Sequence, residues 1–467
     1  MTVTRLSSPR LVVAGLAGDS GKTLLALGLA RSLRDRGLDV RTAKKGPDYI
    51  DAAWLAAASG TACVNLDTFM MSRPGIGAGA RSLEGADVVL VEGNRGLYDG
   101  VDEDGSHSTG ELAKLLGAPV LLIVDVTKAT RTVAAQVLGC RALDPQLGLG
   151  GVVLNRVGTA RQEALVRAAV EGAAGLPVVG AVPRLGGDDP LPGRHLGLVT
   201  AAEHPDRERA ISRAADAVAQ CVDLERVVSL ARSAPAVELP ALEPDSASRS
   251  CRVGYLADPA FSFYYPENLE ALRRGGAELV AVGLGSEAAL PGLDGLYIGG
   301  GFPEVHAERL ANDRSLSGEL RARAEAGLPI YAECGGLMYL ARELVVDGSS
   351  YPMAGVLDLV VEQTPRPQGH GYEVARVDRD NPFFAAGTSL VGHEFHYSRV
   401  VAGEDASATV LTVERGRGVG SGRDGIVKRG VWASYLHLHA LAAPGWADGF
   451  LGLASRFAAD RAGTAVA

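Results

Sequence analysis

Short apolar runs of strand length alternate with amphipathic stretches along the first third of the chain. The alternating segments are RLVVAG (10–15), TLLALGLARSLRDRG (23–37), DVRTAKK (39–45), ADVVLVEG (86–93), TGELAKLLG (109–117), APVLLIVDV (118–126), RTVAAQVLGCRAL (131–143) and LGGVVLNRV (149–157). Strands that are apolar at nearly every position predict a parallel sheet with helices on both faces. The right-handed crossover rule then gives a doubly wound α/β domain.

This alternation stops in VVSLARSAPAVELPALEPDSASRS and starts again after it. The stretch is rich in Pro, Ala and Ser, and beyond its first residues it has neither the strand period nor the helix period, which is typical of a linker. The later segments are CRVGYLAD (251–258), NLEALRRGGAELVAV (268–282), LDGLYIGGG (293–301), LRARAEAGLPIYAECGG (320–336) and GVWASYLHLHAL (430–441). The pattern predicts a first domain over residues 1–225, a linker over 226–250 and a second α/β domain over 251–460.

Composition limits the class of protein. A chain of 467 residues is long enough for two domains, and its 60 glycines suit tight strand-to-helix turns. The net charge of -9 argues against a general binder of nucleic acid or anionic membranes. Five scattered cysteines without a CxxC pair indicate a reduced protein. Since neither a signal peptide nor an apolar run of ~18 residues is visible, we expect a cytoplasmic location.

A glycine-rich stretch, GLAGDSGKT, lies between the first apolar run and the first amphipathic run. In this position, backbone N–H groups at a helix N-terminus can face a phosphate. Lys22 supplies a positive charge, and the Thr23 hydroxyl suits Mg²⁺. The sequence therefore predicts a nucleotide site here, with a plain glycine-rich turn as the alternative.

Acidic residues follow two other predicted strands of this domain. Glu92 ends VVLVEG, and Asp48 and Asp51 follow DVRTA, while Asp99 stands in GLYDG. Ligands of open parallel sheets bind outside the carboxyl ends of the strands, so these carboxylates can converge on the γ-phosphate of a nucleotide. Solvated loop carboxylates are the alternative for each residue alone.

The second domain contains a candidate nucleophile. Cys334 stands between the apolar run LPIYA and the run LMYLARELV, where a sharp strand-to-helix turn is expected. A thiol needs a base to become a nucleophile, and ASYLHLHAL offers His437 and His439 on one face of a predicted strand. The glycines of LYIGGGFPE can direct backbone N–H groups at an oxyanion. Together these groups suit acyl transfer, although a buried cysteine is often inert.

Metal binding is a weaker interpretation of the histidines in this domain. His393 and His396 in HEFHYS, or the two histidines of HLH, have no accompanying Cys or carboxylate cluster at the usual zinc spacing. We therefore do not expect a zinc centre.

The motifs together, in this order, resemble those of the cobyrinic acid a,c-diamide synthase family. The shared stretches are GLAGDSGKT, KKGPDYIDAAW, NLDTFMM, VEGNRGLYDGVD, STGELAKLLGAPVLLIVD, GVVLNRVG, RHLGLV, AFSFYYPENLEAL, GLYIGGGFPEVHA, LPIYAECGGLMYL, GHEFHYS and ASYLHLH. The resemblance implies two doubly wound domains, a dethiobiotin-synthetase-like P-loop domain and a class I glutamine amidotransferase domain. It also implies amidation of two acetate side chains, a and c, of a corrinoid tetrapyrrole with ATP, glutamine and Mg²⁺, the ammonia passing between the domains.

The resemblance also implies roles for individual residues. Those of the second domain are the nucleophile Cys334, its base His437 and the oxyanion loop Gly299, Gly300 and Gly301. Those of the first are the nucleotide-binding residues Gly15, Gly18, Gly21, Lys22, Thr23, Lys44 and Asn155, the catalytic carboxylates Asp48, Asp51, Glu92 and Asp99, and the Mg²⁺ ligands Thr23, Asp48 and Glu92. Many class I amidotransferases carry a glutamate two residues after the histidine. Here that position is His439, which leaves the third member of the triad open.

Three alternatives remain open from sequence. The ring can be another tetrapyrrole, either nickel sirohydrochlorin or hydrogenobyrinic acid. The chain can also be a P-loop regulatory ATPase whose amidotransferase domain is inactive, although Cys334 and His437 argue against this. We expect no nucleic acid and no membrane as partners, and a homodimer is the assembly we consider.

Overall fold

The computed structural model describes residues 2–184, 193–194, 197–243, 249–285, 290 and 292–464. These residues form two compact units, Met1–Glu243 and Pro244–Ala467. Each unit is described by itself below.

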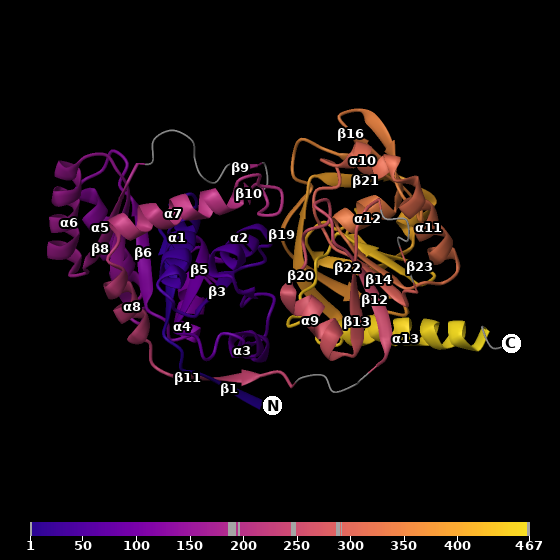
Figure 1. Ribbon diagram of the computed structural model, residues 1–467, viewed down its shortest axis with the longest axis horizontal. Helices are drawn as coiled ribbons and strands as arrows, with labels where there is room; N and C mark the ends of the chain where they lie inside the picture. Colours follow the sequence, from indigo (N-terminus) through magenta and orange to yellow (C-terminus); the bar gives the residue numbers. More distant parts are fainter. Residues whose placement is uncertain are drawn as a thin grey trace. The chain divides into compact units, whose positions relative to one another are not determined.

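Unit 1 is built on a seven-stranded sheet in the order β4-β3-β5-β2-β6-β7-β8, and all its neighbouring strands are parallel (Figure 1). Its strands are β2 (Arg10–Gly15), β3 (Val40–Lys45), β4 (Cys63–Leu66), β5 (Val88–Gly96), β6 (Val120–Asp125), β7 (Leu149–Val157) and β8 (Val178–Pro183). Every residue of β2 is buried, as expected for a central strand covered on both faces. The predicted doubly wound parallel sheet is confirmed.

In the described residues of unit 1, eight helices accompany this sheet. They are α1 (Lys22–Asp35), α2 (Ile50–Ser59), α3 (Arg73–Arg81), α4 (Thr109–Leu115), α5 (Thr132–Leu143), α6 (Ala160–Ala174), α7 (Arg207–Cys221) and α8 (Leu224–Arg232). Alternate strand residues such as Leu11 and Val13 pack with α1, α2, α7 and α8 in one apolar core. This core fixes the end of β2 against the start of α1, where the glycine-rich stretch lies.

The stretch predicted as an unstructured linker, 226–250, contains regular structure. Helix α8 begins after Asp223, whose side chain accepts the N–H of Arg226, and β11 (Val237–Ala241) pairs antiparallel with β1 (Thr2–Leu6). The Pro and Ala content did not indicate β11 as a strand, because its partner is the distant N-terminal segment and because Pro is tolerated on edge strands. Two short strands, β9 (Gly193–Arg194) and β10 (Gly197–Leu198), also pair; His195 of the RHLGLV motif lies outside the described residues.

Unit 2 contains a nine-stranded sheet in the order β13-β12-β14-β15-β24-β23-β22-β19-β20. Its strands are β12 (Cys251–Leu256), β13 (Ala277–Val282), β14 (Gly295–Ile298), β15 (Ile330–Glu333), β19 (Gly369–Val377), β20 (Ser389–His396), β22 (Thr409–Arg415), β23 (Arg423–Lys428) and β24 (Val431–Ser434). Strands β13, β12, β14, β15 and β24 run parallel, and the remaining pairs are antiparallel. The sequence analysis anticipated the α/β class but not this antiparallel half.

A four-stranded sheet, β17-β16-β18-β21, adjoins the turn after β15 and uses β16 (Ala341–Val346), β17 (Ser349–Pro352), β18 (Leu357–Gln363) and β21 (Ser398–Ala402). The helical segments of unit 2 are α9 (Pro266–Arg274), α10 (Ala307–Asn312), α11 (Arg314–Glu325), α12 (Gly335–Leu340), the 3₁₀ turn η1 (Glu404–Ser407) and α13 (Trp446–Thr464). Helices α10, α11 and α12 share a core with Ile298 and Ile330, whereas α9 and α13 share one with Tyr297 and Tyr331. Both faces of the parallel half are therefore covered.

None of the helices in the described part of the chain combines the length and the apolar composition that a membrane span requires.

Candidate active site

The glycine-rich stretch of unit 1 joins the end of β2 to the start of α1. Gly21, the residue before the helix, has a φ of 95°, and a Cβ there would lie 2.2 Å from the Asn155 side-chain nitrogen. A Cβ at Gly15 would lie 2.9 Å from the Ser20 side chain, whereas Gly18 faces open space. Two of the three expected nucleotide-binding glycines are thus required by the local geometry.

Two side chains hold this loop in shape. Lys22 Nζ donates a 2.8 Å hydrogen bond to the Ala17 carbonyl, and Asn155 Nδ2 donates one of 2.8 Å to the Ser20 carbonyl. Burial, followed by the charge of nearby Lys44, lowers the pKa of Lys22. Asn155, one of the expected nucleotide-binding residues, supports the loop through this bond.

A buried ionic cluster lies next to the loop. Thr23 Oγ1 donates a 2.8 Å hydrogen bond to Glu92 Oε1, and Lys44 Nζ lies 2.8 Å from the same oxygen. Lys44 Nζ is also 2.7 Å from Asp51 Oδ2 and 3.8 Å from Asp48 Oδ2. The sheet register explains the cluster, because Lys44 on β3 lies opposite Glu92 on β5, at the carboxyl ends of parallel strands.

The charged groups of this cluster shift one another's pKa values. Burial alone would lower the pKa of Lys44, but the carboxylates of Asp51, Glu92 and Asp48 hold it well above its usual value. Burial raises the pKa of Glu92, and burial together with the Asp51 charge raises the pKa of Asp48 to about 7. Perturbed carboxyl groups around one lysine, beside a phosphate-type loop, are characteristic of a catalytic site.

Asp99 occupies a different position from the other three carboxylates. Its Oδ2 accepts a 2.8 Å hydrogen bond from the Gly96 N–H, and a Cβ at Gly96 would lie 2.7 Å from the Leu16 carbonyl. Asp99 therefore caps the turn after β5 and borders the start of the loop, away from Lys44's direct contacts.

The donor set fits a magnesium ion. Glu92 Oε2 is buried and, among the described residues, has no hydrogen-bond partner, while the Thr23 hydroxyl lies against the other oxygen of that carboxylate. The described residues contain no cluster of three or more His, Cys, Asp or Glu that could hold a metal by themselves. Mg²⁺ is commonly bound through one or two protein oxygens together with substrate phosphates, which agrees with this arrangement.

Cys334 of unit 2 lies on the sharp turn between β15 and α12. Its backbone has φ 48° and ψ -99°, a conformation that costs energy for a residue with a side chain. The neighbouring Gly336 allows the close approach of the turn to β14, since a Cβ there would lie 2.5 Å from the Ile298 carbonyl. The turn predicted from the sequence is present, and it is held in a strained geometry.

His437 lies beside this turn because β15 and β24 are parallel neighbours, with Glu333 opposite Ser434. His437 Nδ1 is 3.5 Å from Glu333 Oε2, and its ring stacks on His393 with centroids 4.8 Å apart. The prediction of a strand through both histidines was wrong, since β24 ends at Ser434. The Asp424 carboxylate accepts the N–H groups of Tyr435 and Leu436 there, which takes the chain out of the ladder.

His439 belongs to a different set of contacts. Its Nε2 lies 3.4 Å from Glu267 Oε2, and its ring lies 4.4 Å from that of Tyr265. Of the two histidines that the sequence left open as a base, His437 contacts Glu333, the residue before Cys334.

The glycine loop 299–301 follows β14 and contacts both candidate groups. A Cβ at Gly300 would lie 2.5 Å from His437 Cε1, and a Cβ at Gly335 would lie 3.0 Å from the Gly301 nitrogen. The Gly299 N–H donates a 2.9 Å hydrogen bond to the Tyr264 hydroxyl. The Gly299 N–H is therefore already hydrogen-bonded in this structure, whereas Gly301 borders the residue after Cys334.

Burial and then the charges of Glu304 and Glu333 raise the pKa of the Cys334 thiol. A thiol in this environment remains protonated unless a neighbouring base accepts its proton. A neighbouring base is therefore needed before this thiol can act as a nucleophile. Sequence reasoning missed Glu333, because its contact with His437 depends on a strand pairing between residues about a hundred positions apart.

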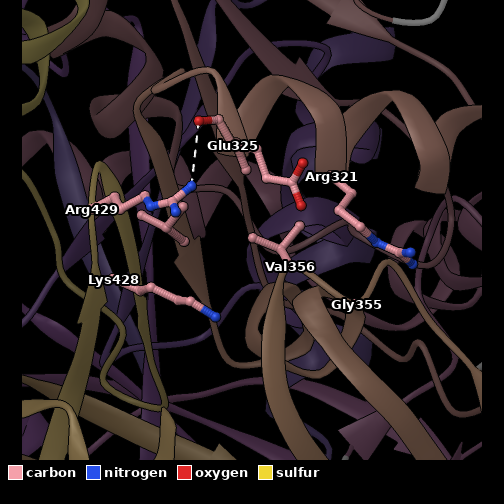
Figure 2. A pocket seen from close by; sticks show the side chains of 8 residues that line it. Arg321, Glu325, Gly355, Val356, Lys428 and Arg429 are labelled. Carbon is pink, nitrogen blue, oxygen red and sulfur yellow. Dashed lines mark hydrogen bonds between the residues drawn. The ribbon is translucent and has the colours of Figure 1, made fainter.

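A cavity of about 320 Å³ in unit 2 lies away from this site (Figure 2). Its lining includes Arg321, Glu325, Lys428 and Arg429, and Arg429 donates to the Glu325 carbonyl. Val431, which begins β24, also lines it, whereas Cys334 is hydrogen-bonded to Ser434 at the other end of that strand. The cavity is therefore at the opposite edge of the sheet and is separate from the candidate site.

Comparison with known proteins supports the division into two functional parts. Residues 11–198 match the CobQ/CobB/MinD/ParA nucleotide binding domain, and residues 252–445 match the CobB/CobQ-like glutamine amidotransferase domain. Three similar curated proteins are all called cobyrinate a,c-diamide synthase. The protein from Magnetococcus marinus is 44% identical (94% of this chain, 96% of the relative), that from Archaeoglobus fulgidus 41% (94% and 96%) and that from Dehalococcoides mccartyi 39% (97% and 99%).

Proposed function

The chain belongs to the cobyrinate a,c-diamide synthase family, and we infer that it converts the a and c acetate side chains of cobyrinic acid into amides. ATP and glutamine are its co-substrates. The observation that carries this inference is the match to relatives of this name over 94% of the chain at 44% identity. The two sites described above supply the two half-reactions.

The Cys334 site suits hydrolysis of glutamine. In this proposal the thiol proton moves to His437, and the sulfur attacks the side-chain amide carbon of glutamine. The tetrahedral oxyanion faces the Gly301 N–H. His437 then gives the proton to the departing nitrogen, ammonia leaves, and water hydrolyses the thioester to glutamate and free thiol.

The loop site of unit 1 suits activation of a carboxylate. One substrate carboxylate oxygen attacks the γ-phosphorus of ATP and the bond to the β-phosphate oxygen breaks, which leaves ADP and an acyl phosphate. Lys22 and the N–H groups at the start of α1 stabilise the charge on the phosphates. Ammonia then attacks the acyl carbon and phosphate leaves, so each amide consumes one ATP. Asp48, Asp51 and Asp99 are proposed to surround the reacting groups.

Magnesium fits beside Thr23 and Glu92, with Asp48 as a further oxygen ligand. When bound, it supplies positive charge to the phosphate oxygens. Lys44 holds the side chains of Asp51 and Glu92 in place, because its ammonium group lies within hydrogen-bond distance of both. These roles, together with the binding of nucleotide by Gly15, Gly18, Gly21 and Asn155, are proposals from geometry and resemblance.

We further propose that residues 1–225 and 251–460 carry the synthetase and glutaminase halves, and that the enzyme works in the cytoplasm without nucleic acid. The net charge of -9 supports the absence of nucleic acid as a partner. The five cysteines, none of them in a disulfide, support the cytoplasmic location. A homodimer is the assembly to be tested first.

The test is mass spectrometry of candidate rings after incubation with ATP, Mg²⁺ and glutamine. Cobyrinic acid, hydrogenobyrinic acid and nickel sirohydrochlorin are compared at equal concentrations. We expect two successive conversions of carboxylate to amide on cobyrinic acid and slower or no conversion of the other rings. Preferred conversion of another ring, or no amidation of any ring, would contradict the proposal.

A further inference from the structure

Glu333 is the last residue of β15 and directly precedes Cys334. Its side chain is fully buried. Its Oε1 accepts a 3.1 Å hydrogen bond from the Leu438 N–H, and its Oε2 accepts one of 3.2 Å from the Tyr297 hydroxyl. The same Oε2 lies 3.5 Å from His437 Nδ1. A buried carboxylate held by two donors and directed at one imidazole nitrogen is a fixed electrostatic partner for that ring.

The Cε1–Nε2 edge of the His437 ring faces the glycine loop. A Cβ at Gly300 would lie 2.5 Å from His437 Cε1 and 3.3 Å from Nε2. The next residue, Gly301, has its nitrogen against Gly335, the residue after Cys334. With Nδ1 toward Glu333, the ring therefore presents Nε2 to the side on which the Cys334 turn lies.

We propose that Glu333 is the positioning carboxylate of a Cys334–His437–Glu333 triad. It holds the proton of His437 on Nδ1, so that Nε2 is the unprotonated nitrogen that takes the thiol proton, and it stabilises the imidazolium that results. The inference rests on the proposed glutaminase half-reaction. The residue two positions after His437, where the resemblance placed a carboxylate, is His439, and that side chain faces Glu267.

Two titratable neighbours, His393 and Tyr297, do not compete with Glu333 for the role of positioning carboxylate. His393 stacks on the ring from β20, and burial, followed by the charges of His437 and His439, lowers the pKa of His393 well below its usual value. Tyr297 contacts the carboxylate as a donor, and burial keeps the pKa of this phenol well above its usual value. The thiol of Cys334 is the proposed proton source.

The test uses the full chain and the variants Glu333→Gln and Glu333→Asp. The matched control is Glu267→Gln, because Glu267 is the carboxylate that faces His439. Two readouts are taken across pH: glutamate release from glutamine, and alkylation of Cys334 by iodoacetamide followed by peptide mass spectrometry. Alkylation needs no ring substrate, so it remains informative if the proposed ring amidation fails.

For Glu333→Gln we expect the kcat for glutamine to fall by about 10²- to 10⁴-fold with KM little changed, as when a triad carboxylate is neutralised. Alkylation slows and its pH profile moves to higher pH, because the thiolate–imidazolium pair is less favoured. Glu333→Asp keeps the charge and recovers part of the rate and the original profile. Glu267→Gln leaves both profiles in place.

A purely structural role gives a different result. Loss of glutamate release in Glu333→Gln with an unshifted alkylation profile overturns the proposal. If Glu333→Gln does not fold, Tyr297→Phe removes one donor to the carboxylate and must still shift the alkylation profile. An unshifted profile in Tyr297→Phe, with an unchanged rate of glutamate release, overturns it too.

Discussion

The backbone N–H of Cys334 donates a 2.7 Å hydrogen bond to the carbonyl of Ser434. This bond ties the turn that carries the candidate nucleophile to the end of β24, and His437 follows three residues later. Because the bond involves only backbone atoms, the side chain of Cys334 can be changed without removing the connection that aligns the two elements.

We therefore expect Cys334→Ala to lose glutamine-dependent amidation while it retains amidation supported by an ammonium salt. The alanine keeps the turn, and free ammonia bypasses the missing nucleophile. The measurement compares both nitrogen sources under otherwise identical conditions. Glutamine-dependent turnover at the wild-type rate would show that the nucleophile has been assigned to the wrong residue.

Glu92→Gln is expected to impair the other half-reaction. The amide oxygen can still accept hydrogen bonds from Thr23 and Lys44, but the buried negative charge is lost. We therefore expect ammonium-supported amidation to fall by about 10²-fold or more and to need a higher concentration of Mg²⁺. The measurement is the amidation rate as a function of Mg²⁺ concentration.

Alkylation of Cys334 serves as the control for Glu92→Gln, since this reaction belongs to unit 2 and should keep its wild-type rate. An unchanged Mg²⁺ requirement with normal turnover argues against a role of Glu92 in the metal and phosphate site.

The local chemistry of both sites could be predicted from short sequence motifs. Residues within such a motif are close in space because they are close along the chain, as in the loop from Gly15 to Thr23 and the turn at Cys334. The parallel strand pattern also predicted that Glu92 and Asp51 converge, and the structure brings both carboxylates within 2.8 Å of Lys44 Nζ. Covalent proximity and the sheet rule were sufficient for these features.

Features that depend on long-range pairing could not be predicted. The contact between Glu333 and His437 needs β15 next to β24, and β11 needs the N-terminal strand as its partner. The hydroxyl of Tyr264, which lies outside the glycine motif, accepts the hydrogen bond from the Gly299 N–H. In each case a local motif contains only one of the two interacting groups, and the packing of the whole unit determines which distant group it meets.

Asp48 gives a pH dependence of stability. Partial burial and the Asp51 charge raise the pKa of Asp48 to about 7, compared with ~3.9 for a free aspartate. The folded state therefore binds the proton more tightly than the unfolded state. The contribution to stability is complete below pH ~4 and is lost as the pH rises toward 7.

Asp48→Asn should remove this loss, since the amide oxygen can still accept the Asp51 N–H. Relative to the wild type, the variant gains stability between pH ~4 and ~7 by at most ~1.4 kcal/mol per pH unit. Screening by water reduces the gain, because the Asp48 side chain is 30% exposed. Urea unfolding of both proteins across this range measures the difference, and a difference independent of pH would contradict the assignment.

His437 and His439 allow the two candidate bases to be separated by one kind of substitution. We expect His437→Asn to lower glutamine-dependent amidation by about 10²- to 10⁴-fold, because the thiol loses its proton acceptor. Ammonium-supported amidation should persist. His439→Asn should cost much less, since an asparagine oxygen can replace the Nδ1 acceptor that receives the Leu441 N–H at 3.1 Å.

The decisive measurement for this pair is the ratio of glutamine-dependent to ammonium-dependent rates in each variant. A general loss of folding lowers both rates together and leaves the ratio unchanged, whereas loss of the base lowers the first rate alone. A collapse of the ratio in His439→Asn with a normal ratio in His437→Asn would transfer the role of base to His439. Because Glu267 is the carboxylate that faces His439, that outcome would also make it, and not Glu333, the partner of the catalytic imidazole.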